Sequence, residues 1–288
     1  MVLTLNSADS ITVKNWFDGT IFDKIENVDF ADGTVWTAAD MEFGLTVTGG
    51  GTVQGGQYAD TLRANAYGAQ LNGGGGDDQL VAMVDGSIFD VTFNGGAGND
   101  ILTGSYGRDI YQFNLGDGHD TITDDVRANG QGVADYFAAN PTTDTYQDRI
   151  EFGAGITAQG VSRSRVGNDL VLTLNANDSI KVKNWFDGTV FNKIEKVVFA
   201  DGTQWTSAFM EQAITVVGTT GADNLVGSAG ADTLIGKLGD DTLAGGAGSD
   251  TYKFTRGDGH DTVVEDDSIA ATDVALFDGG IASSQLWF

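Results

Sequence analysis

The chain has 288 residues and a formal net charge of −26, because 41 Asp and Glu residues outnumber 15 Lys and Arg residues. This charge disfavours nucleic acid and anionic membranes as partners, and it opposes compaction unless something neutralises it. The chain has no cysteine, which excludes disulfides and thiolate metal sites, and no apolar run long enough for a membrane span. The first residues also lack a secretory signal segment.

The chain begins with a module that recurs later. Residues 2–42 and 171–211 are identical at 31 of 41 positions. In the second copy, the alternation in SRSRVGNDLVLTLNANDSIKVKNWF predicts three strands with turns at GND and NAND. KIEKVVFADGTQW predicts a strand pair turning at DG, and TSAFMEQ predicts a helical turn capped by Thr206 or Ser207.

Four tryptophans occupy matching places in the two modules: Trp16, Trp36, Trp185 and Trp205. The simpler interpretation is that they fill the module cores and cover the end of a neighbouring repeat block. The alternative is that they are exposed and stack on a sugar ring.

A nine-residue repeat follows each module. The second block reads GTTGADNLV, GSAGADTLI, GKLGDDTLA and GGAGSDTYK, and the first contains GGQYADTLR, GGGGDDQLV, GGAGNDILT and GSYGRDIYQ. The first block is less regular, because Ala69 stands where Asp is expected and residues 82–94 are too long for one repeat. We expect that edge to lack calcium until Asp109, unless Asp90 substitutes.

The nonapeptide predicts a tight turn followed by a short strand. Glycines permit the turn, and one large apolar residue per repeat points inward: Leu225, Leu234, Leu243 and Tyr252. Two repeats then make one winding of roughly 18 residues, and windings stack at about 4.8 Å. Asp223 would lie over Asp241, and Asp232 over Asp250.

Stacked carboxylates repel one another unless a cation lies between them. Carboxylate and turn carbonyl oxygens suit Ca²⁺, whereas Mg²⁺ requires a smaller octahedron and retains its waters. The absence of Cys and the presence of only two His residues disfavour zinc and copper. The sequence therefore predicts calcium as the cofactor, with about six ions.

The tandem GGxGxDxUx pattern, in which U is a large apolar residue, resembles the RTX, or haemolysin-type calcium-binding, repeat proteins. DIYQFNLGDGHDTI and DTYKFTRGDGHDTV resemble the endings of such repeat blocks, and KNWFDG with KIE.V.FADGT.W resembles the haemolysin-type calcium-binding-related domain. The resemblance covers nearly the whole chain. It implies a parallel β-roll, type I secretion without an N-terminal signal peptide, and folding triggered by extracellular calcium.

The resemblance also implies which residues hold the metal. The carboxylate ligands would be Asp60, Asp78, Asp100, Asp109, Asp117, Asp120, Asp223, Asp232, Asp241, Asp250, Asp258 and Asp261. The turn glycines would be Gly73, Gly76, Gly95, Gly98, Gly218, Gly221, Gly227, Gly230, Gly236, Gly239, Gly245 and Gly248.

We therefore predict an all-β chain in which two parallel β-rolls alternate with small antiparallel β modules. The predicted domains are a partial module (1–48), a first roll (49–122), a complete module with a surface insertion at 126–147 (123–212), a second roll (213–266) and the start of a further module (267–288). Both ends are interpreted as cuts through a longer array.

The sequence favours a calcium-dependent structural spacer in a large secreted bacterial protein. The alternatives are a glycan- or protein-binding adhesin module and an accessory domain of a secreted toxin or hydrolase. We expect no enzyme activity, because no GxSxG nucleophile turn occurs and the abundant acids make any carboxylate pair uninformative. The expected partners are calcium, neighbouring repeats of the parent chain and a possible cell-surface ligand. His119 and His260, both in GDGHD, are interpreted as occupying a structural position.

Overall fold

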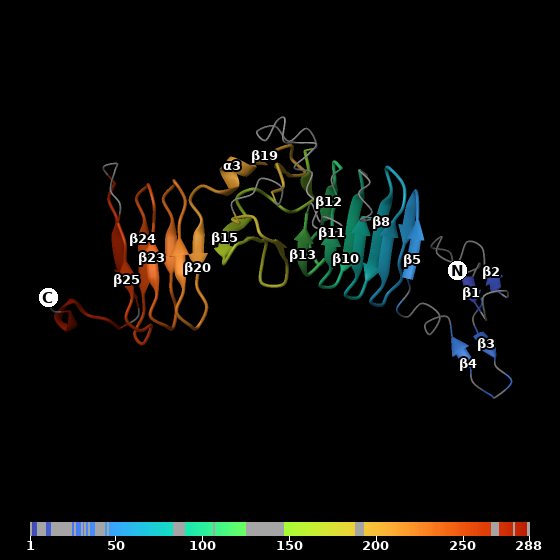
Figure 1. Ribbon diagram of the computed structural model, residues 1–288, viewed down its shortest axis with the longest axis horizontal. Helices are drawn as coiled ribbons and strands as arrows, with labels where there is room; N and C mark the ends of the chain where they lie inside the picture. The colour runs from blue at the N-terminus through green and yellow to red at the C-terminus, as the bar shows by residue number, and fades with distance from the viewer. Residues whose placement is uncertain are drawn as a thin grey trace. The chain divides into compact units, whose positions relative to one another are not determined.

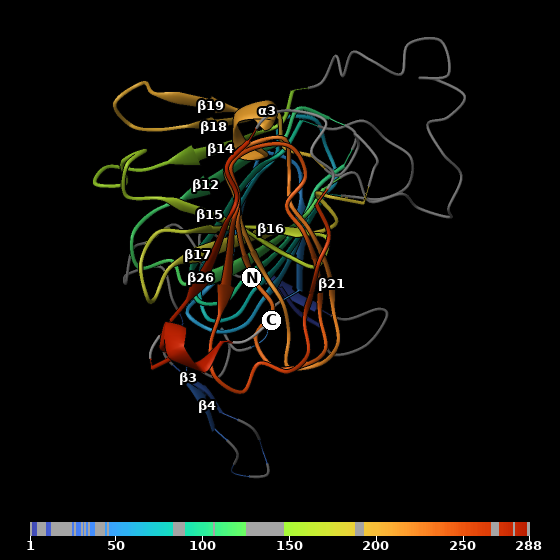
Figure 2. The same cartoon turned by 90° about the vertical axis from the view of Figure 1, so that its left-hand side faces the viewer.

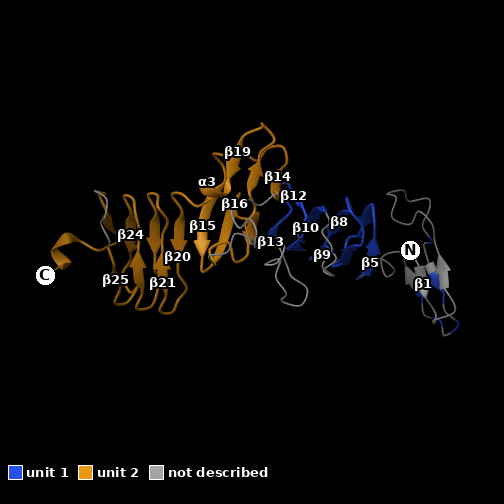
Figure 3. Ribbon diagram, turned by 45° about the horizontal axis from the view of Figure 1, so that its top comes forward, with its two compact units in different colours: residues 1–120, 125–146 blue, residues 121–124, 147–288 orange. Residues whose placement is uncertain are grey.

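The computed structural model describes residues 2–4, 10–12, 25, 27–29, 31, 33, 35–37, 44, 46–82, 90–105, 107–124, 147–187, 193–265, 271–278 and 280–286. The chain divides into two compact units (Figure 3), residues 1–120 with 125–146, and residues 121–124 with 147–288. Several predicted features lie outside the described residues: Trp16, the side chain of Trp36, segment 83–89 and nearly all of the insertion at 126–147.

The first unit contains a parallel β-roll, visible as stacked blue-to-green arrows in Figure 1. One sheet consists of β5 (Thr46–Gly49), β7 (Thr61–Ala64), β9 (Gln79–Ala82) and β11 (Ile101–Thr103). The other consists of β6 (Thr52–Gln54), β8 (Gln70–Gly75), β10 (Thr92–Ala97) and β12 (Ile110–Phe113). The chain alternates between the sheets, so neighbours in one sheet are one full winding apart. β13 (His119–Thr123) follows the roll.

The core of the first roll is a column of one inward side chain per strand. Leu62, Leu80 and Leu102 come from one sheet and are fully buried. Phe93 and Tyr111 come from the other, and their rings stack with centroids 5.0 Å apart. The short strand after each glycine turn therefore stabilises the roll by burying apolar side chains.

The complete module opens the second unit. β15 (Ser162–Val166), β16 (Asp169–Thr173) and β17 (Ser179–Val182) form an antiparallel meander, which confirms the three predicted strands. β18 (Lys196–Val198) and β19 (Gln204–Thr206) form the predicted hairpin, and β14 (Arg149–Phe152) pairs in parallel with β18. The short helix α3 (Ser207–Met210) begins after Thr206, whose hydroxyl accepts the Phe209 N–H.

A second parallel roll continues from this module, because β20 (Thr215–Val217) pairs in parallel with β15. One sheet goes on through β22 (Thr233–Ile235), β24 (Thr251–Phe254) and β26 (Val274–Phe277). The opposite sheet consists of β21 (Asn224–Val226), β23 (Thr242–Ala244) and β25 (Thr262–Val263), and a 3-10 turn, η2 (Ser283–Gln285), follows. Viewed along the roll, its windings nearly superimpose (Figure 2).

The stacking register of the second roll is the predicted one. Asn224 lies opposite Thr242, and Thr233 opposite Thr251, so successive windings are 18 residues apart. The inward residues Leu225, Leu234, Leu243 and Tyr252 form one buried cluster with Ile214 and Val216. The prediction of an all-β chain built around parallel β-rolls is thereby confirmed.

The N-terminal module appears as two antiparallel hairpins. β1 (Val2–Thr4) pairs with β2 (Ser10–Thr12), and β3 (Asn27–Asp29) pairs with β4 (Val35–Thr37). Val28 lies opposite Trp36, as Val197 lies opposite Trp205 in the complete module. The two sequence copies therefore share this strand register. Within the described part of the chain, no helix has the length and apolar character needed to cross a membrane.

Candidate metal centre

Four of the eight repeat aspartates, Asp60, Asp109, Asp223 and Asp232, close their own turns. One carboxylate oxygen, Oδ2, accepts the backbone N–H of the residue four positions earlier, which lies within the glycine-rich turn. Gly56 N donates to Asp60 over 2.6 Å, Ser105 N to Asp109 over 2.8 Å, and Thr219 N to Asp223 over 2.6 Å. Ser228 donates in the same way to Asp232. Aspartate is therefore required for the local turn as well as for any ion, since a shorter or longer side chain would not span this distance.

The second carboxylate oxygen, Oδ1, joins one winding to the next. It accepts the backbone N–H of the equivalent residue one winding earlier, over 2.7 Å from Asp60 N to Asp78 and 2.8 Å from Asp78 N to Asp100. The second roll repeats this link from Asp223 N to Asp241 and from Asp232 N to Asp250, both over 2.8 Å. The stacked aspartates thus form a ladder along one edge of the first roll and along both edges of the second.

Four carboxylate oxygens in this ladder have no hydrogen-bond partner among the described residues. Among the described residues, no donor reaches the buried Oδ2 atoms of Asp78, Asp100, Asp241 and Asp250. A buried charged oxygen without a partner costs several kcal/mol. A cation at these atoms would remove that cost, and carboxylate oxygen is a ligand that Ca²⁺ prefers.

The first glycine of the repeat keeps space open beside these oxygens. A Cβ added to Gly73, Gly95, Gly236 or Gly245 would come within 3.0 Å of Oδ2 of the aspartate in the same repeat. A Cβ on Gly218 or Gly227 would also come within 3.0 Å of Oδ2 of its own aspartate, and it would strike the carbonyl oxygen of Gly236 or Gly245 in the next winding. Carboxylate and main-chain oxygens therefore line a cradle that any side chain would fill, and the residues present fit a calcium ion.

The glycine at the fourth position of the repeat has a different neighbour. A Cβ on Gly98, Gly239 or Gly248 would strike the carbonyl of the equivalent residue one winding earlier, Gly76, Gly221 or Gly230 respectively. Gly98, Gly239 and Gly248 also have positive φ angles of 150°, 132° and 139°, which favour glycine. Gly221 is the exception, since its Cβ would meet only the Thr219 hydroxyl at 3.9 Å.

Burial and neighbouring negative charges raise the pKa of three aspartates in the ladder. Burial, together with the smaller effect of the neighbouring Asp100 and Asp60 carboxylates, raises the pKa of Asp78 to about 7. Burial likewise raises the pKa of Asp100 to about 6, with Asp117 and Asp77 adding to the effect. The pKa of Asp250 is raised by burial and by Asp232 and Asp273. Without a cation, Asp78, Asp100 and Asp250 therefore hold their protons to a higher pH than ordinary aspartates do.

This titration predicts opposite effects of pH with and without calcium. The folded pKa values of Asp78 and Asp100 lie above the value of about 3.9 in an unfolded chain. The folded metal-free state therefore holds more protons, so its free energy of unfolding falls as pH rises from about 4 to about 7. We expect a fall on the order of 1–3 kcal/mol, because solvent at the roll edge screens part of the effect.

Calcium competes with these protons, so the stabilisation by calcium should grow over the same pH window. Urea unfolding in calcium and the residual strand signal in chelator, each at about pH 5 and pH 7.5, measure the two trends. A metal-free protein that becomes more stable towards pH 7.5 would contradict the assignment of these carboxylates.

The first roll carries the complete ladder on one edge only. On the other edge, the strand register aligns Ala69 with Val91 and with Asp109. Asp90 lies one residue away from that position, and its Oδ1 accepts the Arg108 N–H over 2.8 Å. The side chain of Asp90 also forms an ion pair with Arg108 at 3.4 Å. Two buried apolar side chains, Ala69 and Val91, therefore stand where the second roll has aspartates.

The roll endings continue the ladder with a longer spacing. Asp120 Oδ1 accepts Asp100 N over 2.9 Å, and Asp261 Oδ1 accepts Asp241 N over 3.1 Å, each 20 residues later rather than 18. Asp117 and Asp258 instead close their own turns, by accepting Asn114 N and Thr255 N over 2.6 Å. Their carbonyls accept the N–H groups of Gly98 and Gly239. Asp120 and Asp261 thus link successive windings, whereas Asp117 and Asp258 close turns.

The repeat pattern did not predict two features. One is that Asp273 belongs to the aspartate ladder, and the other is a second row of side-chain to main-chain hydrogen bonds. Asp273 Oδ1 accepts Asp250 N over 2.8 Å, so the ladder extends to β26. The signal was present, because Asp273 directly precedes a strand as every repeat aspartate does. One residue before the repeat aspartates, Asn99 N donates to Asp77 and His260 N to Asp240, over 2.8 and 2.9 Å.

This second row of hydrogen bonds explains the two histidines. The His119 N–H donates to Asn99 Oδ1 over 3.1 Å, which gives His119 the same place as His260. It is the main chain of each histidine that makes these bonds, which agrees with a structural position.

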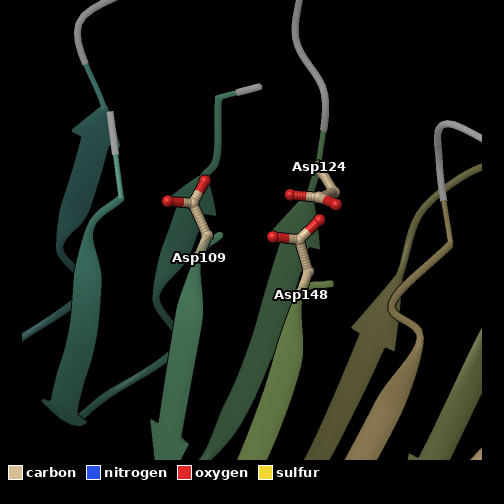
Figure 4. Close-up of side chains that lie close together, drawn as sticks. All are labelled: Asp109, Asp124 and Asp148. Carbon is tan, nitrogen blue, oxygen red and sulfur yellow. The ribbon is translucent and has the colours of Figure 1, made fainter. Parts of the chain in front are cut away.

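Two further acids meet within the second unit. Asp124, just after β13, and Asp148, just before β14, lie side by side in Figure 4, with carboxylate oxygens within 4.8 Å of each other. Both are buried, and Asp148 N donates to Glu195 Oε2 over 2.8 Å. Like Asp273, Asp148 directly precedes a strand, and it lies outside any nonapeptide.

Trp185 and Trp205 lie in the core of the complete module. Trp185 is 0% exposed and donates its indole N–H to Glu211 over 2.9 Å, and Trp205 is 7% exposed. The Trp205 ring lies 4.9 Å from Phe199 and 5.2 Å from Phe209. Neither indole presents a face on which a sugar could stack, so their placement agrees with the core interpretation.

Comparison with protein families agrees with this geometry. The haemolysin-type calcium binding protein related domain matches residues 1–40 and 169–208. The RTX calcium-binding nonapeptide repeat (4 copies) matches residues 54–83, 85–122 and 217–252. No curated protein matches the chain. With glycine turns and stacked aspartates repeated through both rolls, the chain belongs to the RTX calcium-binding repeat proteins.

Proposed function

We propose that this chain is a calcium-folded structural spacer of a large secreted protein. The observation that supports it most is the set of buried, unpartnered Oδ2 atoms of Asp78, Asp100, Asp241 and Asp250, each beside a glycine. A single such atom would be a local defect, whereas its recurrence at the same place in successive windings is a feature of the repeat.

Successive aspartates along each edge would hold the ions together with carbonyl oxygens of the glycine turns. The pairs are Asp60–Asp78, Asp78–Asp100, Asp100–Asp120, Asp223–Asp241, Asp241–Asp261, Asp232–Asp250 and Asp250–Asp273. We retain about six ions for the chain, since a pair at a roll end has fewer surrounding carbonyls. Bound calcium would supply positive charge where the ladder concentrates negative charge.

This arrangement would make folding depend on the calcium concentration of the compartment. With a net charge of −26, the metal-free chain repels itself and stays expanded where calcium is scarce. Extracellular calcium modules bind at roughly 10⁻⁴–10⁻³ M, so the turns would close only outside the cell. Binding free energy then becomes folding free energy. A chain that folds after export can pass through a narrow secretion channel, which supports an extracellular location.

The spacer role is preferred over the two alternatives by what the described residues do. A glycan-binding adhesin module would need exposed aromatic faces, and Trp185 and Trp205 are buried in the module. No described side chain supports an accessory role beside a toxin or hydrolase domain. We assign no catalytic residue, and the acids of the rolls are accounted for by turns and ladders.

Native mass spectrometry of the chain in volatile buffer tests the metal assignment. We expect about six calcium ions per chain, and about half as many when Asp78 and Asp241 are both changed to Asn. Magnesium at equal concentration should leave the chain largely unloaded, because Mg²⁺ retains its waters. Equal loading of the double variant and the unchanged chain, or equal loading by both metals, would refute the proposed ligands.

A further inference from the structure

One edge of the first roll lacks both features that make the calcium cradle. Every other nonapeptide of the two rolls has glycine at its first position and aspartate at its sixth. In ANAYGAQLN these positions are Ala64 and Ala69. In the longer repeat that follows GGGGDDQLV, the first position is Ala82, and the strand register gives the aspartate position to Val91. The cradle glycine and the ladder aspartate are therefore absent together, and we call this side of the roll the alanine edge.

The four side chains of the alanine edge are buried and lie in register. Ala64 is opposite Ala82, and each of the four residues is at most 1% exposed. On the other edge of this roll, a Cβ on Gly73 or Gly95 would come within 3.0 Å of Oδ2 of the aspartate in the same repeat. The alanines carry that Cβ, so apolar contacts replace the oxygen-lined cradle.

The alanine edge also has no need of a cation to neutralise buried charge. Asp109, the next residue in register after Val91, has a donor for each carboxylate oxygen: Val91 N for Oδ1 and Ser105 N for Oδ2, both over 2.8 Å. On the other edge, by contrast, the buried Oδ2 atoms of Asp78 and Asp100 have no donor among the described residues. Removal of calcium therefore leaves an unpartnered buried charge on the edge of Asp78 and not at Ala69 or Val91.

A row of polar side chains just outside the buried ones brings a cation of its own. Asp90 accepts the Arg108 N–H over 2.8 Å and forms an ion pair with the Arg108 guanidinium at 3.4 Å. The Tyr67 hydroxyl donates to the same carboxylate. Because the Arg108 side chain is exposed, this ion pair contributes little, and the buried apolar contacts contribute more.

We propose that the alanine edge holds the windings of the first roll together without calcium, so that this edge stays ordered in the metal-free chain while both edges of the second roll open. The inference rests on the proposed calcium-dependent folding. Thr92 N donates to the Ala69 carbonyl over 2.9 Å, so main-chain bonds already join neighbouring windings here. In a repeat array, stability comes from contacts between neighbours, and one part can open while another stays closed. Calcium would then have only the Asp78 edge left to close in the first roll.

Hydrogen exchange of the unchanged chain in chelator tests the alanine edge. Thr92 and Thr251 each donate a main-chain N–H to the winding before, over 2.9 and 2.8 Å. Thr92 follows Val91, whereas Thr251 follows Asp250, so two amides of one residue type differ in the ladder residue beside them. At neutral pH we expect Thr92 to exchange at least about tenfold more slowly than Thr251, as measured by mass spectrometry with fragmentation to single residues.

The same measurement separates this inference from the proposed function. In calcium both amides should be protected, which verifies that both rolls have folded. Equal exchange of Thr92 and Thr251 in chelator would overturn the inference. If both were fast, calcium-dependent folding would still stand. If both were slow, calcium-dependent folding would be refuted as well, because the second roll would then be ordered without metal.

Restoring both missing features should make the alanine edge depend on calcium. Ala82→Gly opens the space of the cradle, and Val91→Asp places a carboxylate beside Asp109. In the double variant, we expect Thr92 to exchange in chelator as fast as Thr251. Native mass spectrometry should count about one calcium ion more than in the unchanged chain.

Val91→Thr is the matched control, because it has a similar shape and no charge. It should retain slow exchange at Thr92 in chelator and the original number of ions. Circular dichroism in calcium verifies that each variant has folded, and the unchanged chain decides the question if the double variant has not. A folded double variant with unchanged exchange and ion count, or an equal loss of protection in Val91→Thr, would overturn the proposal.

Discussion

Chelation of calcium is expected to remove most of the strand signal in the far-ultraviolet circular dichroism spectrum, and readdition to restore it. The physical reason is the ladder. Without a cation, Asp78 and Asp100 lie buried beside one another and each has a carboxylate oxygen for which the described residues supply no donor. Each unpartnered charge costs several kcal/mol, and several of them exceed the 5–15 kcal/mol by which domains are usually stable. A chelated chain at neutral pH should therefore be largely unfolded.

The variant Asp78→Asn makes this prediction sharper. The amide oxygen can still accept the Asp60 N–H, while the uncharged NH₂ group removes the repulsion from Asp100. Asp78→Asn should therefore be less stable than the unchanged chain in calcium and no less stable in chelator. Urea titration in calcium measures the first difference, and the residual strand signal in chelator measures the second. A spectrum that is the same with and without chelator would show that the rolls fold without metal.

Gly236→Ala is expected to abolish one calcium site and destabilise the second roll. An added Cβ would lie within 3.0 Å of Asp241 Oδ2, the buried oxygen that has no donor among the described residues. Overpacking of this kind typically costs about 1–3 kcal/mol, and the lost ion adds to it in calcium. The backbone of Gly236 does not have a positive φ, so the loss would report the filled cradle rather than backbone strain. Calorimetric titration and thermal unfolding in calcium measure both effects.

Gly221→Ala is the matched control. Gly221 belongs to the same roll and also lacks a positive φ, but its added Cβ would meet only the Thr219 hydroxyl at 3.9 Å. Its carbonyl remains in place after the substitution. We expect calcium stoichiometry and stability close to those of the unchanged chain. If the two alanine variants lose stability equally, general glycine effects would explain the loss and the cradle would not.

Much of the architecture was predictable because each repeat is a local unit. Nine residues contain a complete turn and strand, so the spacing from Asp223 to Asp241 was enough to predict which aspartates stack. The module strands were equally accessible, since their alternation and turn residues act within a few positions. The Thr206 cap followed from the same local chemistry.

Other features depended on contacts that no local pattern carries. Val91, rather than Asp90, aligns with Ala69, because the long connection before β10 shifts the repeat by one residue. Asp273 belongs to the ladder although it lies outside any nonapeptide, since β26 returns to the sheet beside β24. Asp148 meets Asp124 because β14, which Asp148 directly precedes, returns beside the end of β13. In each case the chain between the repeats, not the repeat itself, set the register.

The sequence by itself determined the turns, the inward residues and the chemistry of calcium, because glycine, aspartate and a large apolar residue recur at intervals that act within one or two windings. Only the tertiary structure decided which oxygens lack a donor, which glycines face them and which residue of the long connection takes the aspartate position. Those properties depend on what the neighbouring winding or module contributes, and residues far apart in the chain meet only once the rolls and module have folded.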